Sequence, residues 1–314
     1  MLNRRQLIGS AAALPLVPAA ARAQQADPTS DISTALVPTQ RFRVGEVIVS
    51  ALSDGSLALG PEVLLGIDAE GYDRAMRNAF VEPEQFQAGV NGFLIQSGDL
   101  TMLVDCGTGA AANTGNLVEV LRAAGTEPEA VTHLLATHLH PDHIGGATVD
   151  GEAVFPNAEL VVSETERTYW ANDTNATGGS TDYFRIAQAA LSAYQDRLSA
   201  FDGETQIAPG ITAVPLHGHT PGHTGYRIES GGETLLIWGD IVHVAPVQLA
   251  DPSVGVGFDV APDQARATRE QILEQVANDR TLIAGAHISF PGIGHIARDG
   301  ESYRFAPAPY PYES

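Results

Sequence analysis

The stretch Thr137-His138-Leu139-His140-Pro141-Asp142-His143 places three imidazoles and a carboxylate side by side, directly after an apolar run over residues 131–136. Neutral histidine is the commonest metal ligand at physiological pH. Alternate side chains of an extended chain point to the same side, so His138 and His140 can bind one ion. Asp142 and His143 follow a proline that turns the chain, so they can face a second ion. The pattern predicts a metal site at the end of a buried strand, and the alternative is a histidine-rich surface turn without an ion.

Further ligands must come from elsewhere, because one ion needs about four. Three later segments offer them where an apolar run ends. They are the loop His217-Gly218-His219-Thr220-Pro221-Gly222-His223, the strand end Trp238-Gly239-Asp240 and the strand end Gly285-Ala286-His287. Loops held by a rigid scaffold are where chemistry is usually placed, so we expect these segments to meet.

Together these motifs resemble the metallo-β-lactamase superfamily. Four other segments resemble the branch that holds methyl parathion hydrolase and related quorum-quenching lactonases: ALSDG (51–55), FPNAELVV (155–162), DPSV (251–254) and SFPGIGHI (289–296). The resemblance extends from about Arg41 to Tyr310. It implies an α+β fold, the four-layered αββα sandwich. Among other elements, the sequence predicts helices over 164–170 and 182–200 and a strand over 211–215. The alternation of strands and helices by itself indicates only mixed α and β structure.

The resemblance also implies a site with two divalent metal ions. His138, His140 and His219 would hold one ion; Asp142, His143 and His287 would hold the other; Asp240 would bridge the two. Two such ions can share a hydroxide and lower its pKa toward neutrality, which makes it a nucleophile for a lactone or ester carbonyl. These ligands suit zinc, and iron, cobalt or manganese fit such sites as well. True β-lactamases commonly place a cysteine on the second metal; the one cysteine here, Cys106, lies elsewhere, which argues against a lactamase.

Two residues are expected to be catalytic. Asp142 would be a metal ligand that also passes the hydroxide proton to the leaving group, a role that the superfamily suggests. His243 lies three positions after Asp240, where many acyl-homoserine lactonases of the superfamily carry a tyrosine that hydrogen-bonds the substrate. An imidazole there could make the same bond or act as general acid. The alternative is a histidine on the pocket wall or tied to the backbone.

Other residues are predicted to shape the site. His223 would support the ligand loop. Trp170 and Phe184 correspond to aromatic positions that line the leaving-group pocket in the parathion-hydrolysing relatives, although ordinary helix packing explains them equally well. The loop at residues 110–115 lacks the aromatic residue of those relatives. The pocket should therefore be more open there, which favours lactones or aryl esters over phosphotriesters.

These observations predict a metal-dependent hydrolase that acts on small lactones or esters, of the N-acyl homoserine lactone or aryl ester type. The alternatives are an organophosphate triester hydrolase of the methyl parathion hydrolase type, a glyoxalase II-type thiolesterase, and an exported metal-binding protein without catalysis. Fold and metals do not separate the first two, because the same nucleophile attacks either centre. The relatives suggest a homodimer.

The chain ends and the charge complete the expectations. Residues 1–23 have the charged start, short apolar run and Ala-x-Ala site of a cleaved signal peptide, and Arg4-Arg5 suggests the twin-arginine route. We therefore expect a periplasmic or secreted protein, with an extended arm over 24–40 and a hydrolase domain over 41–314. The net charge of −21 makes nucleic acid and anionic membranes poor partners. No lysine is present, which excludes Schiff-base chemistry.

Overall fold

A computed structural model describes residues 38–109, 114–176 and 180–309. They belong to one compact unit that begins at Val37. Thr39 and Gln40, which close the predicted N-terminal arm, already form the start of the first strand. The rest of that arm and the predicted signal peptide lie outside the described residues. No helix in the described ranges is long and apolar enough to cross a membrane.

The first half of the unit forms a seven-stranded mixed sheet. In spatial order its strands are β1 (Thr39–Val44), β2 (Val47–Leu57), β4 (Ala88–Ser97), β5 (Leu100–Val104), β6 (His133–Leu135), β9 (Glu159–Ser163) and β10 (Leu198–Phe201). The Gly98-Asp99 turn joins β4 to β5 as an antiparallel hairpin in which Ser97 pairs with Leu100. Gly98 has φ +57°, a conformation that glycine adopts without steric cost. From β5 to β10 the neighbouring strands run parallel.

The second half forms another seven-stranded sheet. Its strands are β11 (Thr205–Ala208), β12 (Ile211–Pro215), β13 (Thr224–Ser230), β14 (Glu233–Ile237), β16 (Leu282–Ala284), β17 (Ile293–Asp299) and β18 (Ser302–Pro307). β12 and β14 are both antiparallel to β13, and β14 is parallel to β16. The carboxyl ends of β12, β14 and β16 therefore meet at one edge of the sheet. Two short antiparallel pairs are also present, β3 (Leu64–Leu65) with β15 (Gly255–Val256) and β7 (Thr148–Val149) with β8 (Glu152–Ala153).

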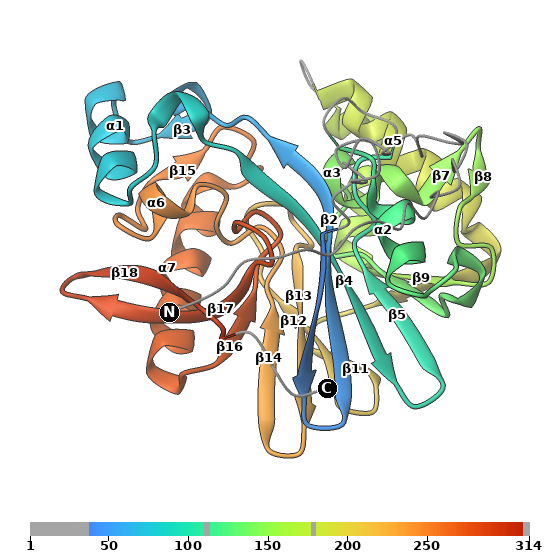
Figure 1. The fold of residues 1–314 in the computed structure, drawn as a ribbon. Helices are drawn as coiled ribbons and strands as arrows, with labels where there is room; N and C mark the ends of the chain where they lie inside the picture. Colours follow the sequence, from blue (N-terminus) through green and yellow to red (C-terminus); the bar gives the residue numbers. More distant parts are fainter. Residues whose placement is uncertain (1–37, 110–113, 177–179, 310–314) are drawn as a thin grey trace, which may run out of the picture. The chain divides into compact units, whose positions relative to one another are not determined.

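Helices cover the outer face of each sheet (Figure 1). The α-helices of the described residues are α1 (Ala69–Asn78), α2 (Leu117–Ala123), α3 (Pro141–Ile144), α4 (Glu164–Trp170), α5 (Thr181–Ala193), α6 (Ala245–Gln248) and α7 (Pro262–Asp279). α1 and α6 pack in a separate cluster with β3 and β15. α2, α4 and α5 pack on the first sheet and α7 packs on the second. α7 begins with proline at its first position, where no backbone N–H is needed, and stops at Arg280 in the left-handed conformation.

The two sheets face each other across the central core. Phe93 and Met102 of the first sheet pack in one buried cluster with Tyr226 and Ile237 of the second. The order is thus helices, sheet, sheet, helices, and the expected αββα sandwich is confirmed. Tyr226 also donates a hydrogen bond of 2.8 Å to the carbonyl of Ala136, which joins the sheets beside the histidine motif.

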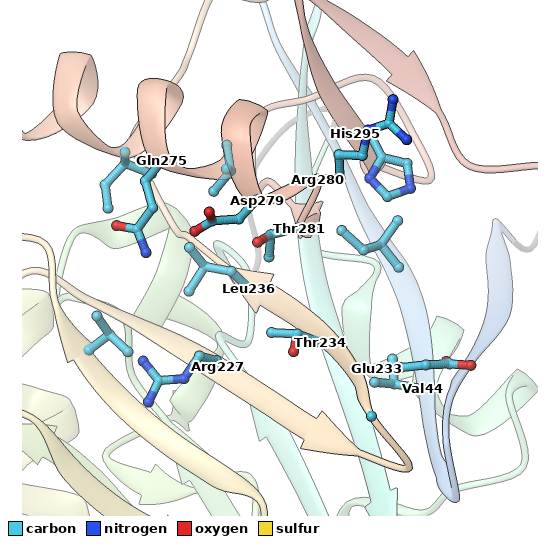
Figure 2. Close-up of a pocket in the computed structure, with 15 residues that line it drawn as sticks. Val44, Arg227, Glu233, Thr234, Leu236, Gln275, Asp279, Arg280, Thr281 and His295 are labelled. Atoms are coloured by element: carbon cyan, nitrogen blue, oxygen red, sulfur yellow. The ribbon is translucent and has the colours of Figure 1, made fainter.

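A cavity of about 640 Å³ lies between α7 and the outer face of the second sheet (Figure 2). Gln275 and Asp279 of the helix lie over Thr234 and Leu236 of β14. None of the predicted metal ligands lines this cavity. The chemistry predicted from the sequence is therefore placed elsewhere, at the strand ends.

Candidate metal centre

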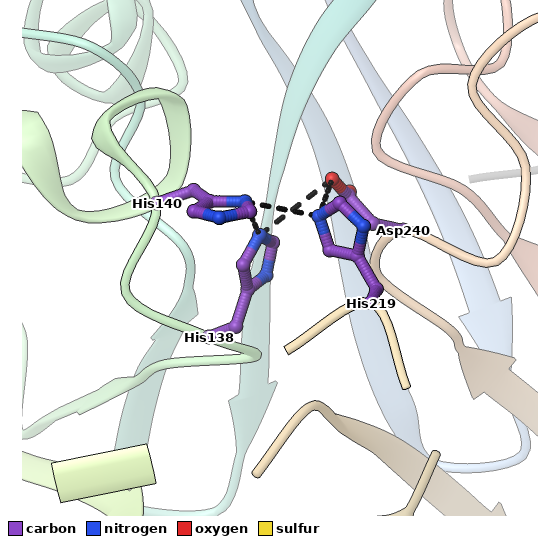
Figure 3. Close-up of side chains that lie close together, drawn as sticks. All are labelled: His138, His140, His219 and Asp240. Carbon is purple, nitrogen blue, oxygen red and sulfur yellow. Dashed lines mark hydrogen bonds and ion pairs between the residues drawn. The ribbon is translucent and has the colours of Figure 1, made fainter. Parts of the chain in front are cut away.

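All seven predicted metal ligands come together. His138, His140, His219 and Asp240 form one group, in which the potential ligand atoms lie within 4.8 Å of one another (Figure 3). Asp142, His143 and His287 form a second group by the same measure. A third group, Asp240 with His243 and His287, shares one residue with each of the other two. The first two groups have the members that the resemblance implied for two ions.

Strand ends and one short helix place these side chains. His138 and His140 follow β6 of the first sheet, and Pro141 then starts α3, which carries Asp142 and His143. The other ligands come from the second sheet. His219 lies in the loop between β12 and β13, Asp240 follows β14, and His287 follows β16. The candidate centre therefore lies where both sheets end, which is where the sequence pattern placed it.

Asp240 belongs to the first group and also lies against histidines of the second. Its Oδ2 lies 3.1 Å from His219 Nε2, 3.6 Å from His138 Nε2 and 3.2 Å from His287 Nε2. Its Oδ1 lies 3.1 Å from His143 Nε2. One carboxylate thus presents its two oxygens to histidines of both groups, which is the arrangement that a bridging ligand requires.

Unpartnered buried atoms indicate that cations fit here. His143 Nε2 and Asp240 Oδ1 are close, but they are not aligned for a hydrogen bond, and neither has a hydrogen-bond partner among the described residues. Leaving such atoms buried and unpaired costs free energy. A divalent cation would satisfy both. The donor set of imidazoles and carboxylates is one that zinc, iron, cobalt and manganese accept.

The outer ring nitrogens of three histidines are fixed by hydrogen bonds. Nδ1 of His143 contacts Asp105 Oδ2 at 2.8 Å, and Nδ1 of His219 contacts Asp259 Oδ1 at 2.8 Å. Nδ1 of His287 donates to the carbonyl of Gly89 at 2.7 Å. A proton held on Nδ1 leaves the lone pair of Nε2 directed into the cluster, as a metal ligand needs. Asp105 and Asp259 are supporting residues that the sequence reasoning missed.

Burial and the neighbouring carboxylates shift the pKa values of the clustered histidines in opposite directions. Burial by itself lowers the pKa of His219, but hydrogen bonds to Asp240 and Asp259 outweigh it and raise that pKa to about 9. Burial lowers the pKa of His140 well below the usual range, and the neighbouring His219 acts in the same direction. The cluster therefore takes up protons around its carboxylates, in the places where cations would bind.

His243 lies inside the cluster. Its Nε2 is 3.0 Å from Asp240 Oδ2, and its ring stacks on that of His287 with centroids 5.0 Å apart. Burial lowers the pKa of His243 to about 4, although the Asp240 carboxylate opposes this shift. At neutral pH the ring is therefore uncharged, and an uncharged imidazole is a much weaker proton donor than the imidazolium that a general acid requires. The hydrogen-bonding role of His243 thus fits this geometry better than the acid role.

His223 lies behind the cluster, where it was predicted to support the loop. Its Nδ1 donates to the carbonyl of Leu216 at 2.8 Å, and its Nε2 accepts the backbone N–H of Asp240 at 3.0 Å. Burial, with His219 nearby, lowers the pKa of His223 to about 3, so the ring is neutral and can accept. Gly239 is needed at this contact, since it has φ +57° and a Cβ there would come 2.4 Å from His223 Nε2.

The two predicted pocket aromatics lie beside the cluster but are buried. Trp170 is 1% exposed and Phe184 is 3% exposed, and both belong to the core under α4 and α5. The Trp170 ring meets His140 edge-on at 5.4 Å. Their role as pocket walls stays a prediction. Ordinary helix packing, the alternative explanation, describes where the two rings lie.

Two other aromatics reach the cluster and were not singled out from the sequence. Tyr183, next to Phe184 in the chain, is 37% exposed, and its ring lies 5.6 Å from that of His140. The ring of Phe258 lies 5.1 Å from that of His243. The Asp142 side chain keeps 20% of its surface exposed, more than any other predicted ligand in the ion pairs of the cluster. The centre is therefore reached from the side of Asp142 and Tyr183. The loop predicted to widen the pocket falls mostly on residues 110–113, outside the described residues.

A family model described as the metallo-beta-lactamase superfamily matches residues 87–287, which include every predicted ligand. The chain belongs to the metallo-beta-lactamase superfamily. Among curated members, an N-acyl homoserine lactonase of Bacillus thuringiensis is 23% identical over 171 residues, 54% of this chain. The chain spans about three fifths (61%) of the length of that relative.

Two solved structures match most of the chain. The hydrolase AbOPH is 30% identical, with a TM-score of 0.83 over 88% of this chain and 99% of its own. AidC, a dizinc quorum-quenching lactonase in complex with the product N-hexanoyl-L-homoserine, is 25% identical, with a TM-score of 0.82 over 87% of this chain and 98% of its own. Superfamily membership and the two ligand groups together support two divalent metal ions in this chain.

Proposed function

We propose that this protein is a dinuclear metal-dependent hydrolase of lactones or esters, of the N-acyl homoserine lactone or aryl ester type. The observation that carries the proposal is Asp240, whose two oxygens face histidines of two separate ligand groups. The relatives named as N-acyl homoserine lactonases support the lactone assignment. We propose zinc as the metal, because histidine and carboxylate ligands suit it and AidC is dizinc.

When bound, two divalent ions would make water nucleophilic at neutral pH and polarise the scissile carbonyl. The protein supplies the rest. Asp142 lies at the open side, with its Oδ2 3.4 Å from His287 Nε2 and 3.6 Å from His143 Nε2. A carboxylate there can accept a proton from the attacking water and return it to the leaving alkoxide, as an acid–base group should.

Three other side chains would orient the reaction. His243 would hold Asp240 in place through their 3.0 Å contact and border the reacting carbonyl. The partly exposed ring of Tyr183 and the ring of Phe258 would flank the acyl chain with apolar surface, as is usual in small-molecule sites.

The test is kcat/KM on a long-chain N-acyl homoserine lactone, measured with metal-replete protein and with the same protein stripped by chelator. We expect metal-dependent turnover at about 10⁴ M⁻¹s⁻¹ or above, the ordinary enzyme range. An aryl ester and a phosphotriester are measured beside it. Turnover far below that range on the lactone, with two ions confirmed per chain and a faster reaction on the phosphotriester, would contradict the proposal.

A further inference from the structure

A buried carboxylate outside the two ligand groups joins the loops that carry them. Glu166 lies in the first turn of α4 and is 0% exposed. It is neither a predicted ligand nor in the ion pairs of the cluster. Carboxylates are almost never fully buried unless they are paired, so its partners explain why it is there.

The two oxygens of Glu166 reach two different loops. Oε1 accepts the backbone N–H of Leu139 at 3.0 Å, and Leu139 lies between His138 and His140. Oε2 accepts the backbone N–H of Gly222 at 2.8 Å, in the loop that carries His219. The first loop follows β6 in one sheet and the second follows β12 in the other, and Figure 3 shows their histidines converging from separate segments.

Glu166 also holds an aromatic ring against the cluster. Trp170 Nε1 donates to Glu166 Oε1 at 2.6 Å, and the same indole meets the His140 ring edge-on. The carboxylate therefore acts on His140 twice, through the backbone beside it and through the ring that packs on it. Burial raises the pKa of Glu166, and the hydrogen bonds from Leu139, Trp170 and Gly222 act in the opposite direction because they favour the carboxylate form.

The contact between α4 and the His219 loop depends on a glycine. A Cβ at Gly222 would lie 2.3 Å from the backbone nitrogen of Glu166 and 2.6 Å from its Cβ. Only glycine lets the loop approach α4 closely enough for the Gly222 N–H to reach the carboxylate. Both the carboxylate of Glu166 and the glycine at position 222 are therefore needed for this bridge.

The second ligand group has other supports. Its histidines are held by Asp105 and by the carbonyl of Gly89, and no hydrogen bond joins Glu166 to either histidine among the described residues. We propose that Glu166 is a positioning residue that sets the spacing of His138, His140 and His219, and thereby the affinity for the ion at that group alone. This inference rests on the proposed function in requiring two bound ions.

The perturbation is Glu166→Gln, which keeps the shape but places an NH₂ where one oxygen was. That NH₂ must face a backbone or indole N–H, so one arm of the bridge is lost. The matched control is Glu164→Gln, which removes the same charge from the same helix at a partly exposed ion pair with Arg167. Zinc affinity of each protein is measured by competition with a chromophoric chelator, and the Co²⁺-substituted absorption spectrum reports ligand geometry.

We expect wild type and Glu164→Gln to bind two ions. In Glu166→Gln one ion should bind about 10–100-fold more weakly, the usual effect of losing a partner that orients metal ligands, while the other keeps its affinity. The Co²⁺ spectrum of the weakened site should change as well. The milder Trp170→Phe, which retains both backbone contacts, should give a smaller loss at the same single site, and it serves if Glu166→Gln does not fold.

Equal loss of both ions, or unchanged affinity at both, would overturn the inference. Equal loss would mean that Glu166 supports the fold in general. Wild-type protein that fails to bind two ions would instead overturn the proposed function, so the two failures are distinguishable.

Discussion

Replacement of Asp105 by asparagine should weaken the second ion site by a defined route. The Asp105 carboxylate accepts Thr137 N–H through Oδ1 at 2.8 Å, and it contacts both Thr137 Oγ1 and His143 Nδ1 through Oδ2 at 2.8 Å each. Asp105 is 3% exposed and has φ +57°. Asparagine tolerates that left-handed conformation as aspartate does, so the backbone need not move.

The amide has two orientations, and each carries a cost. If its NH₂ faces Thr137 N–H, a buried donor is left unpaired, which costs about 1–3 kcal/mol of unfolding free energy. If its NH₂ faces His143 Nδ1, the ring must accept there and carry its proton on Nε2. That proton would occupy the atom directed at Asp240, and the metal affinity should fall about 10–100-fold. At about 1.4 kcal/mol per tenfold, the two costs are of similar size.

The assay is zinc affinity by chelator competition, together with urea unfolding of the stripped protein, for Asp105→Asn and for the exposed control Asp99→Asn. We expect the control to behave as wild type. We expect Asp105→Asn to lose affinity for one ion, stability without metal, or both. Two ions bound with wild-type affinity, in a stripped protein of wild-type stability, would refute the reasoning.

Four further outcomes are expected. His243→Ala should lower kcat while both ions remain; loss of metal with unchanged turnover per bound ion would contradict this. Tyr226→Phe removes the hydrogen bond to the Ala136 carbonyl and should cost about 1 kcal/mol in urea unfolding. Arg269→Met should cost about 1–3 kcal/mol, because buried Arg269 donates to the carbonyls of Pro252 and Val254; an unchanged urea midpoint would argue against it. Removal of metal by chelator should lower Tm, and restored zinc should return it, since ligands bound only to the folded state stabilise it.

The candidate metal ligands are the part of this protein that the sequence locates best. Each lies three to eight residues beyond a strand that apolar runs reveal, so the sequence indicates both the donor atoms and the edge of the sheet where they meet. Several elements were predicted closely for the same reason, among them α4 at 164–170 and β12 at 211–215. Because the candidate ligands follow strand ends, the apolar runs that predict the strands also locate the site.

Supporting residues were harder to predict, because their partners are distant in sequence. Asp259 contacts His219, and Glu166 contacts Gly222, yet neither has a spacing or motif that distinguishes it from surface carboxylates. The periodicity of the sequence also gave a wrong prediction at the edge of the first sheet. A helix expected over 182–200 ends at Ala193, and Leu198–Phe201 instead pairs with β9. That pairing depends on a neighbour's exposed edge, which single-sequence periodicity does not record.

The candidate ligands are divided between the two sheets, and this links metal binding to the folding of the protein. His138 leaves the first sheet, whereas Asp240 and His287 leave the second, so neither half contains a complete binding set. Two metal ions can be bound only after both sheets have formed and docked. Bound metal therefore shows that the two sheets have docked. In a preparation saturated with metal, the number of ions bound per chain would measure the fraction of chains that assembled correctly.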